Sequence, residues 1–515
     1  MKAFEHILNK HFYLIFLLSG IIACSPGNED TTEGNETGLE FQRIPDVEPR
    51  NVIFILSDDH RYDYMSFMQP NEWLQTPNLD RLAREGVHIQ NAFVTTALCS
   101  PSRASILTGQ FSHVHQVVDN QSDADPDLIY FPQYLQQVGY QTAFIGKWHM
   151  GHDSDEPRKG FDRWVSFKGQ GVYYNPTLNV DGEQVVHDDS AYISDVLTEY
   201  ALDFLEQRNQ DSPFFLYLSH KAVHADFSPA KSDYLTYHGK EIPYPRSVNY
   251  TDPDHIQQEE GVNYEDMPEW VKRQRYSWHG VDYAYHRPEY LDTVIWRYNE
   301  SLHSMDASIG NLLDYLDENG LAESTMVIYM GDNGFSFGEH GLIDKRHAYE
   351  ESMRVPMLAR CPEIIQPGSQ IKEMMQNIDI APIILAMAGV ETPSQMNGRS
   401  FLPLLQGDSI SDWRERIYYE YYWESAYPQT PTIFAVRTDV YKYIFNHGVW
   451  DPNELYNLET DPEEVNNLIK SPEHQELALQ LKEDLWQWLE ETGGMQIPLK
   501  KPVMTRLDWE YKGNP

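Results

Sequence analysis

Residues 98–103 read Leu-Cys-Ser-Pro-Ser-Arg, and Ala-Ser-Ile-Leu-Thr-Gly follows as residues 104–109. Pro101 suits the first turn of a helix, where its missing N–H group costs nothing, and Gly109 is a typical helix end. The pattern predicts a helix that begins at or just after Cys99. Unpaired N–H groups and the helix dipole favour an anion there, and Arg103 can reach back towards Cys99 from one turn along. A nucleophile beside a fixed cation suits attack on an anionic ester, although Cys99 alone is also explained as a buried thiol.

Four continuous apolar runs have the composition of strands that are buried on both faces. They span residues 52–56, 142–145, 214–218 and 326–330. Amphipathic helical patterns lie between them, so the sequence predicts an α/β fold with a large mixed or parallel sheet between helices. Such a sheet binds ligands at the carboxyl ends of its strands. Polar side chains follow every run: Asp58 and Asp59, Lys147 and His149, His220 and His224, and Asp332 and Asn333.

These polar side chains belong to two chemical groups. The oxygens of Asp58, Asp59, Asp332 and Asn333 are hard ligands that suit Ca²⁺ or Mg²⁺ rather than zinc. Lys147 and His149 would point to the same face and contact one anion, provided that the backbone stays extended after the strand. Taken singly, each pair is also explained by a helix cap, a solvated turn or a loop without a role.

The stretch at Cys99 resembles the signature of type I sulfatases, which belong to the alkaline-phosphatase superfamily. Further motifs of that family occur in the same order between about residues 50 and 360: Asp58-Asp59, Gly146-Lys147-Trp148-His149, Ala222-Val223-His224, Asp332-Asn333 and Lys345 ahead of Tyr349-Glu350. In that family the cysteine is oxidised to Cα-formylglycine. The resemblance implies that Cys99 is the modified residue. It also implies one Ca²⁺, held by the modified Cys99 with Asp58, Asp59, Asp332 and Asn333.

The resemblance implies catalytic roles for six residues. Cys99, once modified and hydrated, would attack sulfur in a double displacement, and Arg103 would fix the hydrate. Three side chains would hold the sulfate: Lys147, His149 and Lys345. His224 would protonate the leaving alcohol, and His220 is the weaker alternative for that role. Because an unmodified thiol cannot complete the reaction, a formylglycine-generating maturation enzyme is an implied partner.

The substrate implied by the resemblance is an O-sulfate ester of a sulfated polysaccharide or its oligosaccharides. Residues 341–356 resemble N-acetylglucosamine-6-sulfatases and bacterial polysaccharide sulfatases. The strong acidity favours a marine polysaccharide such as ulvan. Three alternatives stay open: a glycosaminoglycan 6-O-sulfatase, a phosphonate or phosphate ester hydrolase of the same superfamily, and a non-catalytic glycan-binding lipoprotein. We expect the aromatic insertion at 226–290 to lie over the site, and His113, His115 and His347 are further candidates for sugar contact.

The charge of the chain limits its partners. Of 515 residues, 79 are acidic and 39 are basic, so the formal net charge is −40. Nucleic acid and anionic membrane surfaces are therefore excluded as general partners. An anionic substrate needs a local cluster of cations or a metal ion to overcome this field. The three cysteines, Cys24, Cys99 and Cys361, imply no disulfide framework.

The N-terminus has the pattern of an export signal. Residues 1–24 combine lysines, an apolar region and a small residue before Cys24, which resembles a lipoprotein signal with a lipid anchor on Cys24. An ordinary cleaved signal is the alternative. Residues 25–48 have the composition of a flexible tether. We expect a catalytic domain at 49–412, an α+β subdomain at 413–515, and a cell-surface or periplasmic lipoprotein, with secretion as the alternative.

Overall fold

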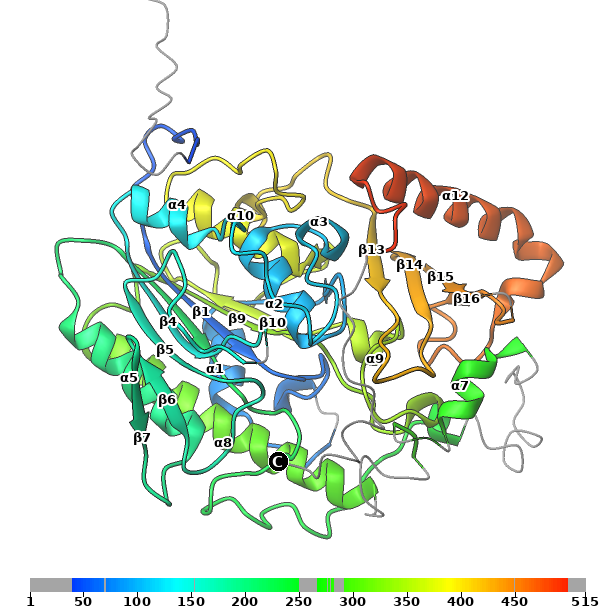
Figure 1. Ribbon diagram of the computed structural model, residues 1–515, viewed down its shortest axis with the longest axis horizontal. Helices are drawn as coiled ribbons and strands as arrows, with labels where there is room; N and C mark the ends of the chain where they lie inside the picture. The colour runs from blue at the N-terminus through cyan, green and yellow to red at the C-terminus, as the bar shows by residue number, and fades with distance from the viewer. Residues whose placement is uncertain are drawn as a thin grey trace, which may run out of the picture.

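The computed structural model describes residues 39–68, 71–151, 153–249, 266–275, 277, 279–281, 291–448 and 450–498 (Figure 1). The proposed signal with Cys24, and much of the proposed tether, lie outside these residues. Among the helices of the described chain, none is both long enough and apolar enough to cross a membrane.

A ten-stranded sheet forms the centre of the molecule, in the order β11-β2-β10-β9-β1-β8-β4-β5-β6-β7. Its strands are β1 (Asn51–Ser57), β2 (Val87–Ile89), β4 (Gln141–Lys147), β5 (Arg163–Phe167), β6 (Thr177–Val180), β7 (Glu183–Val186), β8 (Phe214–Ser219), β9 (Thr325–Gly331), β10 (Met357–Arg360) and β11 (Ser369–Ile371). The five strands from β9 to β5 run parallel, while β10 and β6 are antiparallel to their inner neighbours. The predicted large mixed sheet is therefore confirmed.

The four predicted apolar runs form β1, β4, β8 and β9, which are adjacent strands of this sheet. In the register of the sheet, Leu56 of β1 lies between Met330 of β9 and Ser219 of β8. Ser219 in turn lies opposite Gly146 of β4. The carboxyl ends of these strands are therefore level, and the polar residues after them meet at one edge of the sheet.

Helices cover both faces of the sheet (Figure 1). One face carries α2 (Cys99–Thr108), α4 (Pro132–Gln137) and α10 (Ile380–Met387), and the other carries α1 (Pro77–Glu85), α5 (Ile193–Gln207) and α8 (Leu291–Glu318). Alternate residues of β1 enter two separate cores, because successive side chains of a strand point to opposite faces. Phe54 and Leu56 join the first core, and Ile53 and Ile55 join the second.

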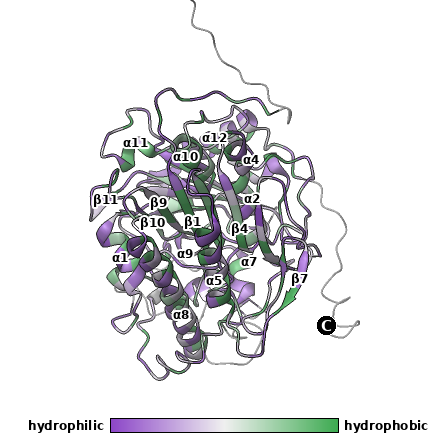
Figure 2. Ribbon diagram, turned by 90° about the vertical axis from the view of Figure 1, so that its left-hand side faces the viewer, coloured by the Kyte–Doolittle hydropathy of each residue, from purple (hydrophilic) through white to green (hydrophobic). Residues whose placement is uncertain are grey.

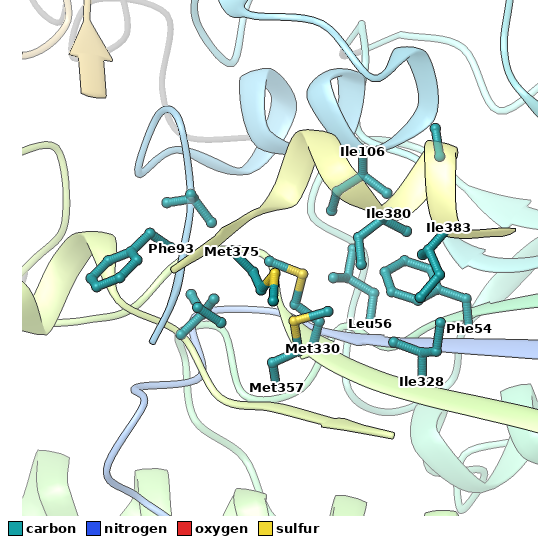
Figure 3. Close-up of a cluster of buried hydrophobic side chains, with 14 of the residues drawn as sticks. Phe54, Leu56, Phe93, Ile106, Ile328, Met330, Met357, Met375, Ile380 and Ile383 are labelled. Atoms are coloured by element: carbon teal, nitrogen blue, oxygen red, sulfur yellow. The ribbon is translucent and has the colours of Figure 1, made fainter. Parts of the chain in front are cut away.

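The core above β1 fixes the position of α2. Phe54 and Leu56 lie beside Ile106 of α2 and Ile380 and Ile383 of α10 (Figure 3). All five side chains are buried. Because this packing is apolar and dense, it holds α2 against the sheet and brings its first residue to the edge where β1 ends.

Hydropathy follows the same layers. The central strands β1, β4 and β9 carry hydrophobic residues, while the helices α1, α5 and α8 also carry hydrophilic ones (Figure 2). The shorter helices are α3 (Ser112–His115), α7 (Glu269–Gln274), α9 (Glu350–Met353) and α11 (Leu402–Leu405). A further short strand, β3 (Ala92–Phe93), follows β2 and pairs with β12 (Met375–Gln376) in a separate two-stranded sheet.

A smaller antiparallel sheet lies towards the C-terminus, in the order β13 (Arg416–Tyr421), β14 (Thr432–Thr438), β15 (Tyr441–His447) and β16 (Glu454–Asn457). The helix α12 (Gln475–Thr492) packs on it through Leu481, Leu485 and Trp488 (Figure 1). The α+β character expected here is confirmed. In β16, Leu455 pairs with Tyr443 of β15 and is buried.

Candidate active site

The helix that carries Cys99 begins as the sequence predicts. Cys99 is the first residue of α2, and Leu98 before it has an extended backbone with φ −158° and ψ 133°. Gly109 ends the helix with φ 67°, a left-handed conformation that favours glycine. The Cys99 side chain is buried, and its Sγ lies 3.4 Å from Oδ1 of Asp58 and 3.2 Å from Nζ of Lys345.

Two pairs of oxygen-bearing side chains face each other at the ends of β1 and β9. The backbone N–H of Asp59 donates to Oδ1 of Asp332 over 3.0 Å, and Nδ2 of Asn333 donates to Oδ1 of Asp59 over 2.7 Å. An oxygen from each of Asp58, Asp59 and Asp332 lies within 4.8 Å of the other two. Three buried carboxylates this close repel one another, so the arrangement needs cations.

The donor set fits a hard divalent cation. Oδ2 of Asp59 and Oδ1 of Asn333 are buried, and no hydrogen-bond partner for either lies in the described part of the chain. Buried oxygens without partners are costly unless a ligand or an ion satisfies them. Asp59 lies in one group with the carboxylates of Asp58 and Asp332, and Asn333 is hydrogen-bonded to Asp59, so this group can hold an ion that prefers oxygen ligands.

Arg103 joins three strand ends. Its Nε donates to Oδ2 of Asp332 over 2.9 Å, and its Nη1 donates to Oγ of Ser219 over 2.6 Å and to the Lys147 carbonyl oxygen over 2.7 Å. The guanidinium is buried. Its hydrogen bonds therefore hold β9, β8 and β4 in register rather than ending on Cys99.

Two ammonium groups pair with the two carboxylates after β1. Nζ of Lys147 forms an ion pair with Asp58, and Nζ of Lys345 forms one with Asp59. Burial favours the neutral acid at Asp58, but Lys147 and its neighbouring cations hold the pKa of Asp58 well below its usual range. Burial together with the charge of Asp58 raises the pKa of Asp332 to about 7. Burial raises the pKa of the Cys99 thiol to about 12.

His149 departs from the expected geometry. The sequence argument assumed an extended backbone after the strand, which would align His149 with Lys147. Strand β4 instead ends at Lys147, and His149 has a φ of 55°. Its ring Nδ1 lies 3.4 Å from Oγ of Ser100, which also donates to the His149 carbonyl oxygen. The turn therefore packs His149 against the start of α2, so the shared-face argument was wrong.

The loop after β8 brings His224 to the cluster. The backbone N–H of Asp58 donates to the Ala222 carbonyl oxygen over 2.9 Å, and that of Val223 donates to the Asp58 carbonyl oxygen over 2.7 Å. Nδ1 of His224 lies 2.7 Å from the Ala225 carbonyl oxygen, and its Nε2 lies 3.9 Å from Oδ2 of Asp59. Burial and the charge of Lys147 hold the pKa of His224 well below its usual range.

His220 takes no part in the contact between His224 and Asp59. Its ring is buried, and neither ring nitrogen has a hydrogen-bond partner within the described chain. Its backbone N–H donates to the Leu56 carbonyl oxygen over 2.8 Å, as part of the sheet. The geometry thus favours His224 over His220 as the histidine that faces the site.

A pocket of about 560 Å³ opens above His224 and Lys345. Its described lining also includes Asn120, Gln121, Gln170, Gly171, Val172, Tyr173, Tyr174, Lys221, Ala225, Asp226, Ser228, His279, Arg346 and Tyr427. Three of these, Asp226, Ser228 and His279, come from the insertion that we expected over the site. Gln170, Lys221, Arg346 and Tyr427 were not predicted from the sequence. Lys221 and Arg346 did carry a signal, since Lys221 directly precedes the Ala222-Val223-His224 motif and Arg346 directly follows Lys345.

The three histidines suggested for sugar contact do not line this pocket. Nδ1 of His113 lies 2.8 Å from Oε2 of Glu420 on β13, and Nε2 of His115 lies 3.0 Å from Oγ of Ser105. Nε2 of His347 lies 3.0 Å from Oγ of Ser336. All three are buried, so they contribute to the packing of the molecule rather than to a surface that a sugar reaches.

The chain belongs to the sulfatase family. The family model described as Sulfatase matches residues 50–390, and a second, described as N-sulphoglucosamine sulphohydrolase, C-terminal, matches residues 338–491. The chain is a sulfuric ester hydrolase of the alkaline-phosphatase superfamily, as its motifs predicted.

Two named sulfatases and one solved structure are similar to the chain over most of its length. It is 35% identical over 489 residues to an N-acetylglucosamine-6-O-sulfatase of Bacteroides thetaiotaomicron, covering 86% of each chain. It is 28% identical to an ulvan-active sulfatase of Formosa agariphila, covering 86% of this chain and 81% of that one. A solved structure, BT4656 in complex with its substrate D-glucosamine-2-N,6-O-disulfate, matches with a TM-score of 0.75 and 32% identity, over 88% of this chain and 100% of that one.

Proposed function

We propose that this protein hydrolyses the 6-O-sulfate ester of a glucosamine-type sugar derived from a glycosaminoglycan-like polymer. The observation that carries the proposal is the cluster itself: Cys99 lies between a carboxylate of Asp58 and the ammonium of Lys345, and Lys345 also lines the pocket together with Lys221 and Arg346. The substrate class rests on the 35% identity to the N-acetylglucosamine-6-O-sulfatase over most of both chains.

The proposed cofactors are one Ca²⁺ and a formylglycine formed from Cys99. The ion would be held by Asp58, Asp59, Asp332 and Asn333 together with residue 99, and the oxygens of Asp59 and Asn333 that lack hydrogen bonds support this assignment. When bound, Ca²⁺ supplies positive charge for the sulfuryl oxygens. The formylglycine hydrate supplies the nucleophilic hydroxyl that the family resemblance implies.

The basic side chains around the cluster would stabilise the charge on the sulfate and position the other groups of the site. Lys147 and Lys345 already lie beside the carboxylates, so their ammonium groups can donate to sulfuryl oxygens and stabilise the charge that develops there. Arg103 would hold Asp332 in place through its 2.9 Å hydrogen bond. His149 would position the start of α2 through Ser100 and contact the sulfate.

His224 is the proposed general acid. The Ala225 carbonyl oxygen, 2.7 Å from Nδ1, orients the ring so that Nε2 faces the cluster. Since Nδ1 keeps a proton that it donates to the Ala225 carbonyl oxygen, this role requires a second proton on Nε2, and the negative charge of a bound sulfate ester would favour that protonated form. The Nε2 proton would then pass to the departing alcohol oxygen. The same ring lines the pocket, which is where that alcohol would lie.

A second candidate is a sulfatase of ulvan. It is favoured by the 28% identity to an ulvan-active sulfatase and by the net charge of −40. A phosphonate or phosphate ester hydrolase and a non-catalytic glycan-binding lipoprotein are the remaining alternatives. The first would release a phosphonate or phosphate rather than sulfate, and the second would retain an unmodified thiol at Cys99.

The proposed function is tested by measuring activity on a panel of substrates, with a chemical check that residue 99 is modified. The chain is expressed with a formylglycine-generating enzyme, and the peptide that contains residue 99 is checked by mass spectrometry. Sulfate release is measured from N-acetylglucosamine 6-sulfate, its 3- and 4-sulfated isomers and ulvan oligosaccharides, and release of the alcohol is measured from a phosphonate monoester. We expect the 6-sulfate to be cleaved fastest and Cys99→Ala to be inactive. Faster cleavage of ulvan oligosaccharides, or equal release by Cys99→Ala, would contradict the proposal.

Export and anchoring are also proposals. We propose that Cys24 carries a lipid, although this residue lies outside the described chain. Labelling of the expressed protein with a fatty acid should be lost in Cys24→Ala and kept in Cys361→Ala, because Cys361 is buried. Equal labelling of both variants would exclude the anchor.

A further inference from the structure

The pocket above the cluster is cationic in a chain with a net charge of −40. Three lysine or arginine side chains occur in its described lining: Lys221, Lys345 and Arg346. Lys345 forms an ion pair with Asp59. Arg346 forms ion pairs with Asp344 over 2.6 Å and with Glu424 over 2.9 Å. Two of the three charges are therefore compensated by carboxylates of the protein.

Lys221 is different. Only 3% of the residue is exposed. Lys221 forms no ion pair with any residue that the structure describes, whereas Lys147 and Lys345 each pair with a carboxylate. Nζ of Lys221 lies 4.7 Å from the centroid of the Tyr173 ring and 3.4 Å from the Ala225 carbonyl oxygen. The hydroxyl of Tyr173 donates to the His224 carbonyl oxygen over 2.5 Å. The ammonium is thus held against a fixed wall, close to the proposed general acid.

Burial of the Lys221 ammonium is energetically unfavourable unless an anion lies beside it. Burial of a charge is costly unless a partner or hydrogen bonds compensate for it, and one long hydrogen bond and one ring face compensate only in part. Burial and the nearby charge of Lys147 lower the pKa of Lys221 to about 8. Of the nearby carboxylates, Asp58 and Asp59 are paired with Lys147 and Lys345, whereas Asp226 lines the same pocket and attracts Lys221 without forming an ion pair with it. An anionic group that enters the pocket would therefore be attracted to Lys221.

We propose that Lys221 binds a second negatively charged substituent, a sulfate or a carboxylate, on the sugar or disaccharide whose sulfate ester is cleaved. This inference rests on the proposed function, because it assumes that a sulfated sugar occupies the pocket. Lys221 is then a specificity-determining residue. A charge-assisted hydrogen bond from its ammonium would favour doubly anionic substrates over singly sulfated ones.

The test compares substrates that differ in their second charge. Wild type, Lys221→Gln and Lys221→Arg are assayed on N-acetylglucosamine 6-sulfate, on N-sulfoglucosamine 6-sulfate, and on a disaccharide that links the N-acetylated 6-sulfate to a uronate. The first substrate has one anionic group, and the other two add a sulfate or a carboxylate. The matched control is Lys231→Gln, because Lys231 is exposed and its Nζ lies 5.4 Å from the centroid of the Tyr174 ring.

We expect Lys221→Gln to lower kcat/KM for the doubly anionic substrates by about 10- to 100-fold, mainly through KM, which corresponds to one lost hydrogen bond to a charged group. Its kcat/KM for the singly sulfated sugar should change by less than about threefold, because that sugar lacks the second anion and loses no charge-assisted hydrogen bond. Lys221→Arg should retain most of the preference, and Lys231→Gln should behave as wild type. A loss confined to the N-sulfated sugar would identify the second group as a sulfate, and a loss confined to the uronate disaccharide would identify it as a carboxylate.

Two results would overturn the inference. The first is an equal loss on all three substrates, with an unchanged melting temperature, which would assign Lys221 to the cleaved ester. The second is no change on any substrate. Failure of the proposed function itself is a different result, since wild type would then cleave none of the panel. In that case the affinity of Cys99→Ala for the same sugars, with and without Lys221→Gln, still decides whether Lys221 selects the second anion.

Discussion

Two buried ion clusters lie at opposite ends of one short loop. The catalytic cluster comprises Asp58, Asp59, Cys99, Lys147, Asp332, Asn333 and Lys345. The interface cluster comprises Glu350, Arg437, Lys442 and Glu464. The loop contributes Lys345 to the first and Glu350 to the second. Both clusters are buried and rich in charge, yet their hydrogen bonds differ.

Each carboxylate oxygen of the interface cluster lies within 3.2 Å of a cation or a backbone N–H of the protein, although the contact between Lys442 and Oε1 of Glu464 is an ion pair without hydrogen-bond geometry. Nζ of Lys442 lies 2.9 Å from Oε1 of Glu350, 2.8 Å from Oε1 of Glu464, and 2.8 Å from the Ala348 carbonyl oxygen. Nε and Nη2 of Arg437 donate to the two oxygens of Glu350 over 3.0 and 3.2 Å. Two cations therefore balance two carboxylates and join α9 to β14 and β15 of the C-terminal sheet.

The catalytic cluster keeps acceptors free. Oδ2 of Asp59 and Oδ1 of Asn333 have no hydrogen-bond partner among the residues that the structure describes. The difference teaches how to distinguish two kinds of buried charge. A saturated cluster stabilises the fold, whereas a cluster with free oxygens is prepared for a ligand. Substitutions in the first should change stability, and substitutions in the second should change turnover.

The largest effect is expected from Lys345→Met. Loss of an ammonium that faces the sulfuryl group should lower kcat/KM for the 6-sulfated sugar by on the order of 10³-fold. In the presence of Ca²⁺, the free energy of unfolding should change little, since Asn333 still donates to Asp59. Sulfate release and urea unfolding measure the two quantities. A loss of stability as large as the loss of activity would show that the two clusters do not differ.

The opposite pattern is expected from Lys442→Met. Removal of this ammonium leaves Glu350 and Glu464 buried with one fewer cation, which should cost about 3 kcal/mol of unfolding free energy. The folded enzyme should keep the kcat/KM of wild type. Urea unfolding measures the first change, and Lys372→Met, at an exposed lysine, provides the control. A large fall in kcat/KM at unchanged stability would contradict the assignment of this cluster to structure.

Calcium should stabilise only one of the clusters. At a concentration of 100 times its Kd, Ca²⁺ should raise the free energy of unfolding by about 2.7 kcal/mol. Asn333→Ala removes one of the free oxygens, so its increment should be smaller, whereas Lys442→Met should retain the full increment. Thermal unfolding with and without a chelator measures this difference. An equal increment in both variants would place the ion elsewhere.

The smallest effect concerns His113 and Glu420, which join α3 to β13. Burial lowers the pKa of His113, but the carboxylate of Glu420 reverses this and leaves it above its ordinary value of 6.5. Burial raises the pKa of Glu420, but His113 and its hydrogen bonds leave it below 4.5. The stability from His113 is complete below pH 6.5 and is lost as the pH rises through its raised pKa. The stability from Glu420 is complete above pH 4.5 and is lost as the pH falls through its lowered pKa.

The pair should therefore stabilise the fold most between pH 4.5 and 6.5. In His113→Gln, the unfolding free energy should fall by about 1.5 kcal/mol at pH 5.5 and by less at pH 9, where the histidine of wild type is neutral. Urea unfolding at the two pH values provides the measurement. A loss that grows from pH 5.5 to pH 9 would exclude the charged pair.

The sequence determined the central sheet and much of the cluster at its edge. Continuous apolar runs are typical of strands buried on both faces, and the carboxyl ends of parallel strands meet at one edge, so Asp58 and Asp332 could be placed together from the runs at 52–56 and 326–330. Pro101 and Gly109 likewise fixed the limits of α2. These features depend on local patterns, which a chain carries in its order of residues.

Only the tertiary structure decided the rest. The turn at His149, the solitary charge of Lys221 and the contribution of Tyr427 to the pocket depend on neighbours that are distant in sequence. The two buried clusters also could not be distinguished from the sequence, because a sequence does not show whether a lysine or a metal ion balances the charge of an Asp or Glu. The number of donors that reach each carboxylate is set by packing, and packing is what separates a structural ion pair from a ligand site.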